Sequence, residues 1–320
     1  MSQFQNLPDE IILKVLGHLK VKDLLNCGQL SKRIRAISHD KTLYQKINLD
    51  GKKVRTTFLE KIIINKGCKD LSLSGAQLVG SDFNLNEKSQ LTCLNLDSCA
   101  AYRVKNLEIL TGSCVKLQKI SMRKLTKLVL SSDMIKNVCN QNGQTLQVLN
   151  FEDCLETGEG LSADQVLLIT KKCIALKEVN FNFALFYDSV EPITNNLPPS
   201  VQHLSLREFM GMKDWDIVDL VKRCNQIHFL DLGKTAIKNN CLPEIIRNLQ
   251  DSLEELNFQT FHFYYTPHES FAEFFGLKLL TRLKILHVVA CSFMEKRLKE
   301  ELPGVVINNL ETNGKYCCRH

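Results

Sequence analysis

The sequence predicts an α/β fold: a solenoid of strand–loop–helix units that follows a short, all-helical N-terminal segment. Two observations lead to this prediction. The first is an apolar pattern, apolar–x–x–apolar–x–apolar, which recurs along most of the 320 residues. The second is a change of period before residue 46, where apolar residues recur at helical spacing instead. The chain is therefore expected to hold one repetitive domain and one small helical domain.

The middle apolar residue marks each copy of the repeat. Nine copies have their middle position at Leu71, Leu94, Ile120, Leu149, Val179, Leu204, Leu230, Leu256 and Leu286. Successive middle positions are 23 to 30 residues apart, and leucine-rich repeats have a period of roughly 20–29 residues. Ile47–Leu49 and Val305–Ile307 fit as degenerate first and last copies. The pattern thus predicts a leucine-rich-repeat solenoid.

Helices are expected between the strands. Asp164–Lys172 has a helical pattern, with Ser162 as its N-cap and lysines in the last turn. Asp216–Arg223 has the same form. One such unit cannot bury its own apolar face, so stacked units must supply the core. We expect parallel strands on the concave face and helices on the convex face, over residues 46–310 and about ten repeats, followed by a tail at 311–320.

Residues 1–45 do not fit the repeat and predict three short helices. Pro8 and two carboxylates begin the first helix, whose apolar face is formed by Ile12, Val15, Leu16 and Leu19. Leu24 and Leu25 centre the second helix, and Ser31 can cap a third that runs to about Ser38. A segment this small usually needs a partner, a metal or a disulfide to complete its core.

Six of the 13 cysteines follow the spacing of the repeat. Cys99, Cys154 and Cys291 lie three residues after the third apolar position, and Cys114, Cys173 and Cys224 lie three residues before the first. Small buried side chains suit these tight turns, and this spacing favours packing over the alternative of a redox or metal-binding set. With no secretion signal, we expect free thiols in a reducing compartment, cytoplasmic or nuclear, and no metal site.

Composition argues against several classes of function. The 41 basic and 35 acidic residues are scattered, so neither nucleic acid nor a membrane is an expected partner. No apolar run reaches the roughly 18 residues of a membrane span. Walker, G-x-S-x-G, H-E-x-x-H and dinucleotide motifs are absent from the sequence. We therefore expect no enzyme, no catalytic residue and no cofactor; a hydrolase hidden in the solenoid has no motif in its favour.

The helical segment resembles the F-box. The resemblance is carried by Leu7 to Leu16, Leu24-Leu25, Leu30 to Arg33 and Leu43-Tyr44. The repeats, in turn, are similar to the cysteine-containing leucine-rich repeats found in F-box proteins. Ile34 and Tyr44 depart from the family, which commonly has tryptophan at both places. The resemblance implies a non-catalytic subunit of an SCF-type cullin–RING ubiquitin ligase, which docks a Skp-type adaptor and holds a protein substrate, phosphorylated ones included, for ubiquitination.

Matching positions in the F-box give candidate adaptor contacts or their immediate support. These are Leu7, Pro8, Ile11, Val15, Leu16, Leu24 and Leu25. The alternative is that these side chains only close the core of the helical segment. In that case the chain is a non-catalytic interaction scaffold that works outside a ligase.

Side chains beside each middle apolar residue should point outward on the strand face, because successive residues of a strand alternate. Arg123 and Arg207 could bind a phosphate or carboxylate there, or could instead pair with Glu152, Glu208 or water. Aromatic residues gather in the C-terminal half, partly as core and partly as exposed anchors. The predicted substrate-binding residues are Arg123, Glu152, Arg207, Trp215, Asp231, Gln259, Tyr264 and Tyr265.

Overall fold

The computed structural model describes residues 7–85, 87–125, 130–154, 160–184, 190–260, 271–290 and 292–309. The chain forms two compact units, Met1–Ile120 and Ser121–His320, and each is described by itself. Across the described ranges, no helix has the length and apolar character needed to cross a membrane.

The first unit begins with the helical head. It consists of α1 (Asp9–Leu16), α2 (Val21–Cys27), α3 (Lys32–Ser38) and the 3-10 helix η2 (Lys41–Tyr44). Ser31 caps α3 as predicted, its Oγ accepting a hydrogen bond from the Ile34 N–H at 3.1 Å. Arg33 fastens α3 to the start of α1, because its guanidinium donates to Asp9 Oδ1 at 2.7 Å and to the Leu7 carbonyl at 2.6 Å. The head is thus held together by a small apolar core and by the ion pair between Arg33 and Asp9.

The rest of the first unit contains the first repeats. Strands β1 (Lys46–Asn48), β3 (Asp70–Ser72), β5 (Cys93–Asn95) and β7 (Lys119–Ser121) follow one another in one sheet. A second, small parallel sheet of β2 (Lys53–Arg55), β4 (Gln77–Val79) and β6 (Ala100–Ala101) was not predicted, because these strands lie outside the recurring apolar pattern. The helical elements are α4 (Thr56–Glu60), the π-helix η3 (Lys61–Asn65) and α5 (Lys105–Ser113).

The second unit continues the repeat with seven described strands. They are β8 (Val148–Asn150), β9 (Glu178–Asn180), β10 (His203–Ser205), β11 (Phe229–Asp231), β12 (Glu255–Asn257), β13 (Ile285–Val288) and β14 (Val306–Asn309). Neighbouring strands are parallel, and each predicted middle residue lies opposite the next, as in Leu204 opposite Leu230. The middle residues of all nine predicted copies are buried.

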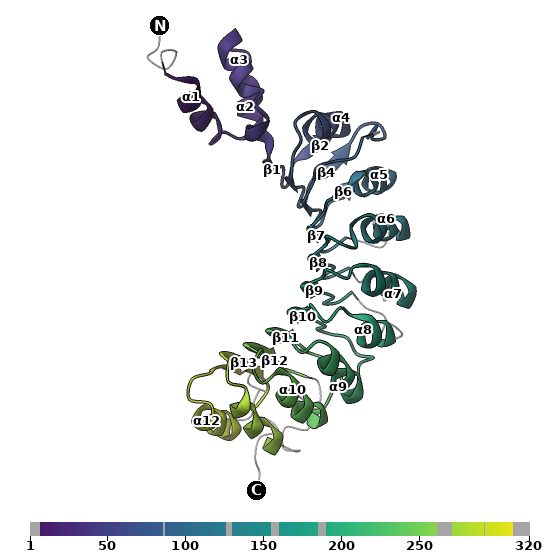
Figure 1. Cartoon of the computed structure of the whole chain (residues 1–320), viewed down its shortest axis with the longest axis vertical. Coiled ribbons are helices and arrows are strands. Elements are labelled where there is room, and N and C mark those ends of the chain that lie inside the picture. The colour runs from purple at the N-terminus through teal and green to yellow at the C-terminus, as the bar shows by residue number, and fades with distance from the viewer. Residues whose placement is uncertain are drawn as a thin grey trace. The chain divides into compact units, whose positions relative to one another are not determined.

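Helices cover the other side of these strands in the second unit. They are α6 (Ser132–Asn142), α7 (Ala163–Lys172), α8 (Val190–Asn196), α9 (Asp214–Arg223), η5 (Asn239–Cys241), α10 (Leu242–Leu249), η6 (Phe271–Leu279) and α12 (Ser292–Glu301). Figure 1 shows β8 to β12 along the inner side of this unit and α6 to α9 along its outer side. Ser162 caps α7 in a full capping box with Gln165. The predicted α/β solenoid is confirmed.

A left-handed turn follows the strand in successive repeats. Six non-glycine residues adopt positive φ at this point: Ser98, Lys124, Asp153, Phe183, Glu208 and Lys234. The strain is offset where the backbone ladder continues through the turn, as in the Asp153 N–H that donates to the Asn182 carbonyl at 2.8 Å. The next residue then turns inward, which is where Cys99 and Cys154 lie buried.

Burial decides the role of the repeat cysteines. Cys99, Cys114, Cys154, Cys173 and Cys224 are all buried, and Cys291 lies outside the described residues. Burial raises the pKa of Cys99 and Cys224 to about 12 and that of Cys114 to about 11, so these thiols stay protonated at neutral pH. The ten cysteines in the described ranges are free. For the five buried ones, the packing interpretation is confirmed.

Candidate protein-binding surfaces

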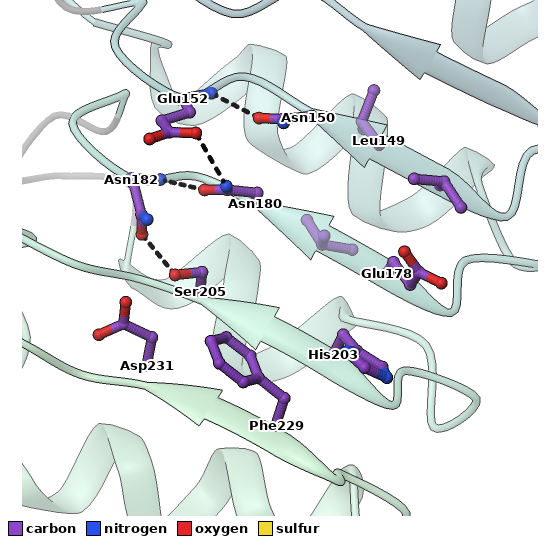
Figure 2. A pocket seen from close by; sticks show the side chains of 12 residues that line it. Leu149, Asn150, Glu152, Glu178, Asn180, Asn182, His203, Ser205, Phe229 and Asp231 are labelled. Carbon is purple, nitrogen blue, oxygen red and sulfur yellow. Dashed lines mark hydrogen bonds between the residues drawn. The ribbon is translucent and has the colours of Figure 1, made fainter. Parts of the chain in front are cut away.

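The strand face of the second unit holds a groove that spans β8 to β11 (Figure 2). Its volume is about 340 Å³. Because the middle residue of each strand points into the core, the residues on either side of it form the groove. The groove is therefore lined by outward-facing side chains from four neighbouring repeats, which are largely polar.

Asparagine side chains organise the groove through one repeated hydrogen bond. Asn150 Oδ1 accepts from the Glu152 N–H at 2.9 Å, and Asn180 Oδ1 accepts from the Asn182 N–H at 2.9 Å. Asp231 performs the same task for the Gly233 N–H at 2.8 Å. Each side chain therefore caps the end of its own strand. Because the asparagine oxygens are engaged, the NH₂ groups are the donors that these amides can offer a ligand.

Strand β10 is capped differently, because Ser205 stands where the other strands of the groove have the capping asparagine or aspartate. Its hydroxyl instead donates to Asn182 Oδ1 at 2.6 Å. The same Asn182 oxygen accepts from the Arg207 N–H at 2.9 Å. One repeat thus caps the strand of the next, and the Ser205 hydroxyl is committed to this network (Figure 2).

The predicted charged residues meet in pairs across the strands. Arg123 Nε lies 3.1 Å from Glu152 Oε2, so the predicted alternative of pairing with Glu152 holds for this arginine. Glu208 pairs with Lys234, whereas Arg207 lies beside Gly233. A Cβ placed on Gly233 would lie 3.2 Å from Arg207 Nη1 and 3.0 Å from Asp231 Oδ1. The missing side chain lets the Arg207 guanidinium approach Asp231.

Asp231 is the buried carboxyl of this face. Burial raises its pKa above the ordinary value, while the Gly233 N–H, Arg207 and Ser205 act in the opposite direction. Most other strands of this unit place an uncharged side chain at this position, an asparagine at Asn150, Asn180 and Asn257 and a serine at Ser205. Asp231 therefore adds a charge at a site that the repeat does not require to be charged.

Four of the predicted substrate-binding residues lie outside the groove or outside the described residues. Trp215 is exposed, as predicted, but it stands in the first turn of α9, on the helical side, under Lys213 Nζ at 4.8 Å. The structure does not bring it to the groove. Gln259 is buried at the end of β12, where its N–H donates to Asn257 Oδ1 at 3.1 Å. Tyr264 and Tyr265 fall outside the described residues.

The prediction missed one column of the groove. Glu178, His203 and Phe229 precede the middle residues of β9, β10 and β11, and they line the groove with the polar column that follows. The rings of His203 and Phe229 stack with centroids 6.0 Å apart, which adds a flat apolar element (Figure 2). The signal was present in the sequence, because residues on both sides of a buried strand position face the same way.

The head carries the second surface, which is apolar. Ile11, Val15 and Leu25 are 41%, 43% and 41% exposed, and Leu30 is 72% exposed. Pro8 is exposed and Leu7 is half-buried. Leu16 and Leu24 are buried instead, so they support this surface from within the head. Leu30 is part of the F-box resemblance but not of the predicted contacts, and its exposure adds it to this surface.

The two departures from the F-box pattern belong to the core of the head. Ile34 and Tyr44 are both buried. The Tyr44 hydroxyl donates to the Ser38 carbonyl at 2.9 Å, and Lys66 Nζ lies 4.7 Å from the centre of its ring. Burial raises the pKa of Tyr44, so the hydroxyl keeps its proton and the hydrogen bond. Both side chains fill space inside the head and lie beneath its surface.

Comparisons with known proteins match the helical head and the repeats to two different family models. A family model described as F-box-like matches residues 4–50, and a model described as the SKP2 LRR domain matches residues 59–313. A solved structure described as "Crystal structure of TLR13-ssRNA13 complex" is similar over 83% of this chain, at 13% identity and a TM-score of 0.37. The chain spans 45% of the length of that protein.

Two segments of the sequence also agree with the order of the two matched regions. Leu43 to Lys52 leads from the head into the first strand, and Leu298 to Pro303 precedes the last, in a manner similar to the S-phase kinase-associated F-box protein. The repeat match covers more than half of the chain. The chain is therefore an F-box-like, leucine-rich-repeat protein that belongs to the family of the SKP2 LRR domain.

Proposed function

We propose that this protein is the substrate-recognition subunit of an SCF-type cullin–RING ubiquitin ligase in the cytoplasm or nucleus. The head docks a Skp-type adaptor, and the strand face of the repeats binds a protein substrate for ubiquitination. The observation that carries the proposal is the exposed apolar set on an F-box-like head, formed by Ile11, Val15, Leu25 and Leu30. The family is typically non-catalytic, and the chain contributes binding rather than chemistry.

The head surface fits a protein partner. Ile11 and Val15 lie one turn apart on α1, and both are exposed. Exposed apolar surface of this kind marks interaction sites, and short helices like these cannot cover it themselves. Ile11, Val15 and Leu25 would contact the adaptor, together with Leu7 and Pro8. Leu16 and Leu24 would hold the helices in place beneath them.

The groove fits an extended segment of a substrate. Amide donors from Asn150 and Asn180 and the carboxylate of Glu178 can pair with the polar groups of a peptide main chain. The stacked His203 and Phe229 rings offer a place for one apolar side chain. The phosphate of a phosphorylated substrate would replace Glu152 as the partner of Arg123, because the arginine fork binds carboxylate and phosphate alike. Trp215, Gln259, Tyr264 and Tyr265 stay predicted contacts.

The test is co-purification of the full chain with a Skp-type adaptor. Ile11→Asp and Val15→Asp should each reduce adaptor capture more than tenfold, because a buried unpaired carboxylate in the interface costs roughly 2 kcal/mol or more. Ile174→Asp is the matched control, since Ile174 is an exposed apolar residue of a repeat. Adaptor capture that survives both head variants contradicts the proposal. Failure of the unaltered chain to bind any adaptor, with protein binding at the groove intact, favours the scaffold alternative.

A further inference from the structure

A second cavity, of about 530 Å³, opens in the first unit between α2 and the first repeat. Its volume lies in the range of sites that hold ligands, roughly 300–1,000 Å³. Its walls are apolar and come from both elements: Val21, Leu25, Leu49, Val54 and Phe58. Leu25 is exposed and Phe58 half-buried, so part of this apolar wall faces solvent.

The rim of this cavity is strongly basic. Five exposed cations surround it, against the single carboxylate of Asp23: Lys20, Lys22, Lys52, Lys53 and Arg55. None of the five forms an ion pair with any described residue. Other cations of the same unit do pair, as in Lys46 with Asp70 at 3.2 Å and Arg103 with Asp82 at 3.0 Å. The rim is thus a concentration of unpaired positive charge on a chain whose charges are otherwise nearly balanced.

Local alternation builds the combination of apolar wall and basic rim. In β2, Lys53 and Arg55 are exposed while Val54 between them is buried. At the start of α2, the exposed N-cap residue Lys20 and the exposed Lys22 flank the buried Val21. In β2 the neighbours of the buried Val54 face away from the core, and the four cations of the two triplets all line the cavity.

We propose that this cavity binds an acidic peptide segment of a protein partner that carries one apolar anchor side chain. The anchor would occupy the apolar cavity, and the flanking carboxylates would pair with the rim cations. Exposed cations steer an oppositely charged partner and set its selectivity, while the buried anchor provides most of the affinity. The cavity shares Leu25 with the head surface, but the inference goes beyond the ligase proposal and can be tested without an adaptor.

The experiment measures fluorescence anisotropy of a labelled peptide with the full-length chain. The probe is a short run of Glu and Asp with one central Leu. Two matched peptides replace the Leu with Ser or all acidic residues with their amides. We expect the probe to bind, both matched peptides to bind at least tenfold more weakly, and affinity to fall as salt rises, because exposed ion pairs are screened.

Charge reversal at the rim locates the site. The double variant Lys22→Glu, Lys53→Glu should weaken probe binding by tenfold or more. The double variant Lys69→Glu, Lys105→Glu is the control, because it removes the same charge from exposed positions of the same unit outside the cavity. Phe58→Ala should remove the preference for Leu over Ser, with thermal unfolding recorded to confirm that the variant is folded.

Three outcomes would overturn the proposal. The first is equal binding of the probe by the rim and control variants. The second is equal binding of the Leu and Ser peptides, which would leave charge alone as the cause. The third is absence of probe binding together with rim-dependent binding of phosphatidylserine vesicles, which would make the cavity a site for a membrane surface instead.

Discussion

The head and the repeats of the second unit treat apolar side chains in opposite ways. In the repeats, each middle residue is buried, because the neighbouring strand and helix cover it on both sides. In the head, Ile12, Leu16 and Leu24 are buried, while Ile11, Val15, Leu25 and Leu30 stay exposed. The same residue types therefore serve packing in one region and are left for a partner in the other.

The difference follows from what each region can supply as cover. A repeat has a copy of itself on either side, so its apolar face is always matched by a complementary face. The head has helices of only seven or eight residues, and three such helices enclose only a few side chains. Exposed apolar surface on the head is thus a consequence of its size, and it supports the proposed binding role.

The largest effect that tests this contrast is a cavity in the repeat core. Leu204→Ala should lower the free energy of unfolding of the second unit by about 2–5 kcal/mol, because Leu204 is fully buried between its neighbours. Val15→Ala in the head should change stability by about 0.5 kcal/mol or less, since the side chain is partly exposed. Urea denaturation followed by circular dichroism measures both. Similar losses of unfolding free energy for the two variants would contradict the proposed difference between head and repeats.

A smaller effect is expected where repeat helices approach each other closely. A Cβ at Gly143, which ends α6, would clash with the Lys172 carbonyl of α7 and lie 2.9 Å from the Cys139 carbonyl. Gly143→Ala should therefore cost about 1–3 kcal/mol. Gly17→Ala in the head is the counterpart, because its nearest neighbour would be 3.3 Å away. Its melting temperature should stay close to that of the unaltered protein; a loss equal to that of Gly143→Ala would show that the head is packed as tightly as the repeats.

The smallest effect concerns charge inside the repeats. Folding raises the pKa of Asp231 above its ordinary value of 3.8 through burial. Its stabilising contribution is therefore fully present below that value and is lost as pH rises through the raised folded-state pKa. Asp231→Asn keeps the acceptor for the Gly233 N–H, so it should raise the melting temperature at neutral pH and give no gain at about pH 3.

The control for this pH effect is Asp251→Asn, which removes an exposed carboxylate of the same unit. Thermal unfolding at both pH values should show little change for this variant. An equal gain for Asp231→Asn at neutral and acidic pH would mean that the charge is not the cause. Repeats would then tolerate a buried carboxylate as readily as the exposed surface does.

Much of the fold was predictable because the repeat imposes one rule on many residues. Register, burial of the middle residues and the inward cysteines all follow from a single spacing, and Ser31 and Ser162 mark helix starts by local chemistry. The groove was only half predicted. The polar column after each middle residue was found, whereas Glu178, His203 and Phe229 were missed although the same alternation places them on that face.

What the sequence alone determined is the periodic architecture, because the apolar period reports which residues must be covered by a neighbouring unit. Tertiary structure decided what the period cannot specify. It separated Ile11 and Val15 from Ile12 and Leu16 on one helix face and placed Trp215 on the helical side. It also joined α2 to the first repeat around a basic-rimmed cavity. These outcomes depend on how elements distant in sequence cover one another, which no local spacing records.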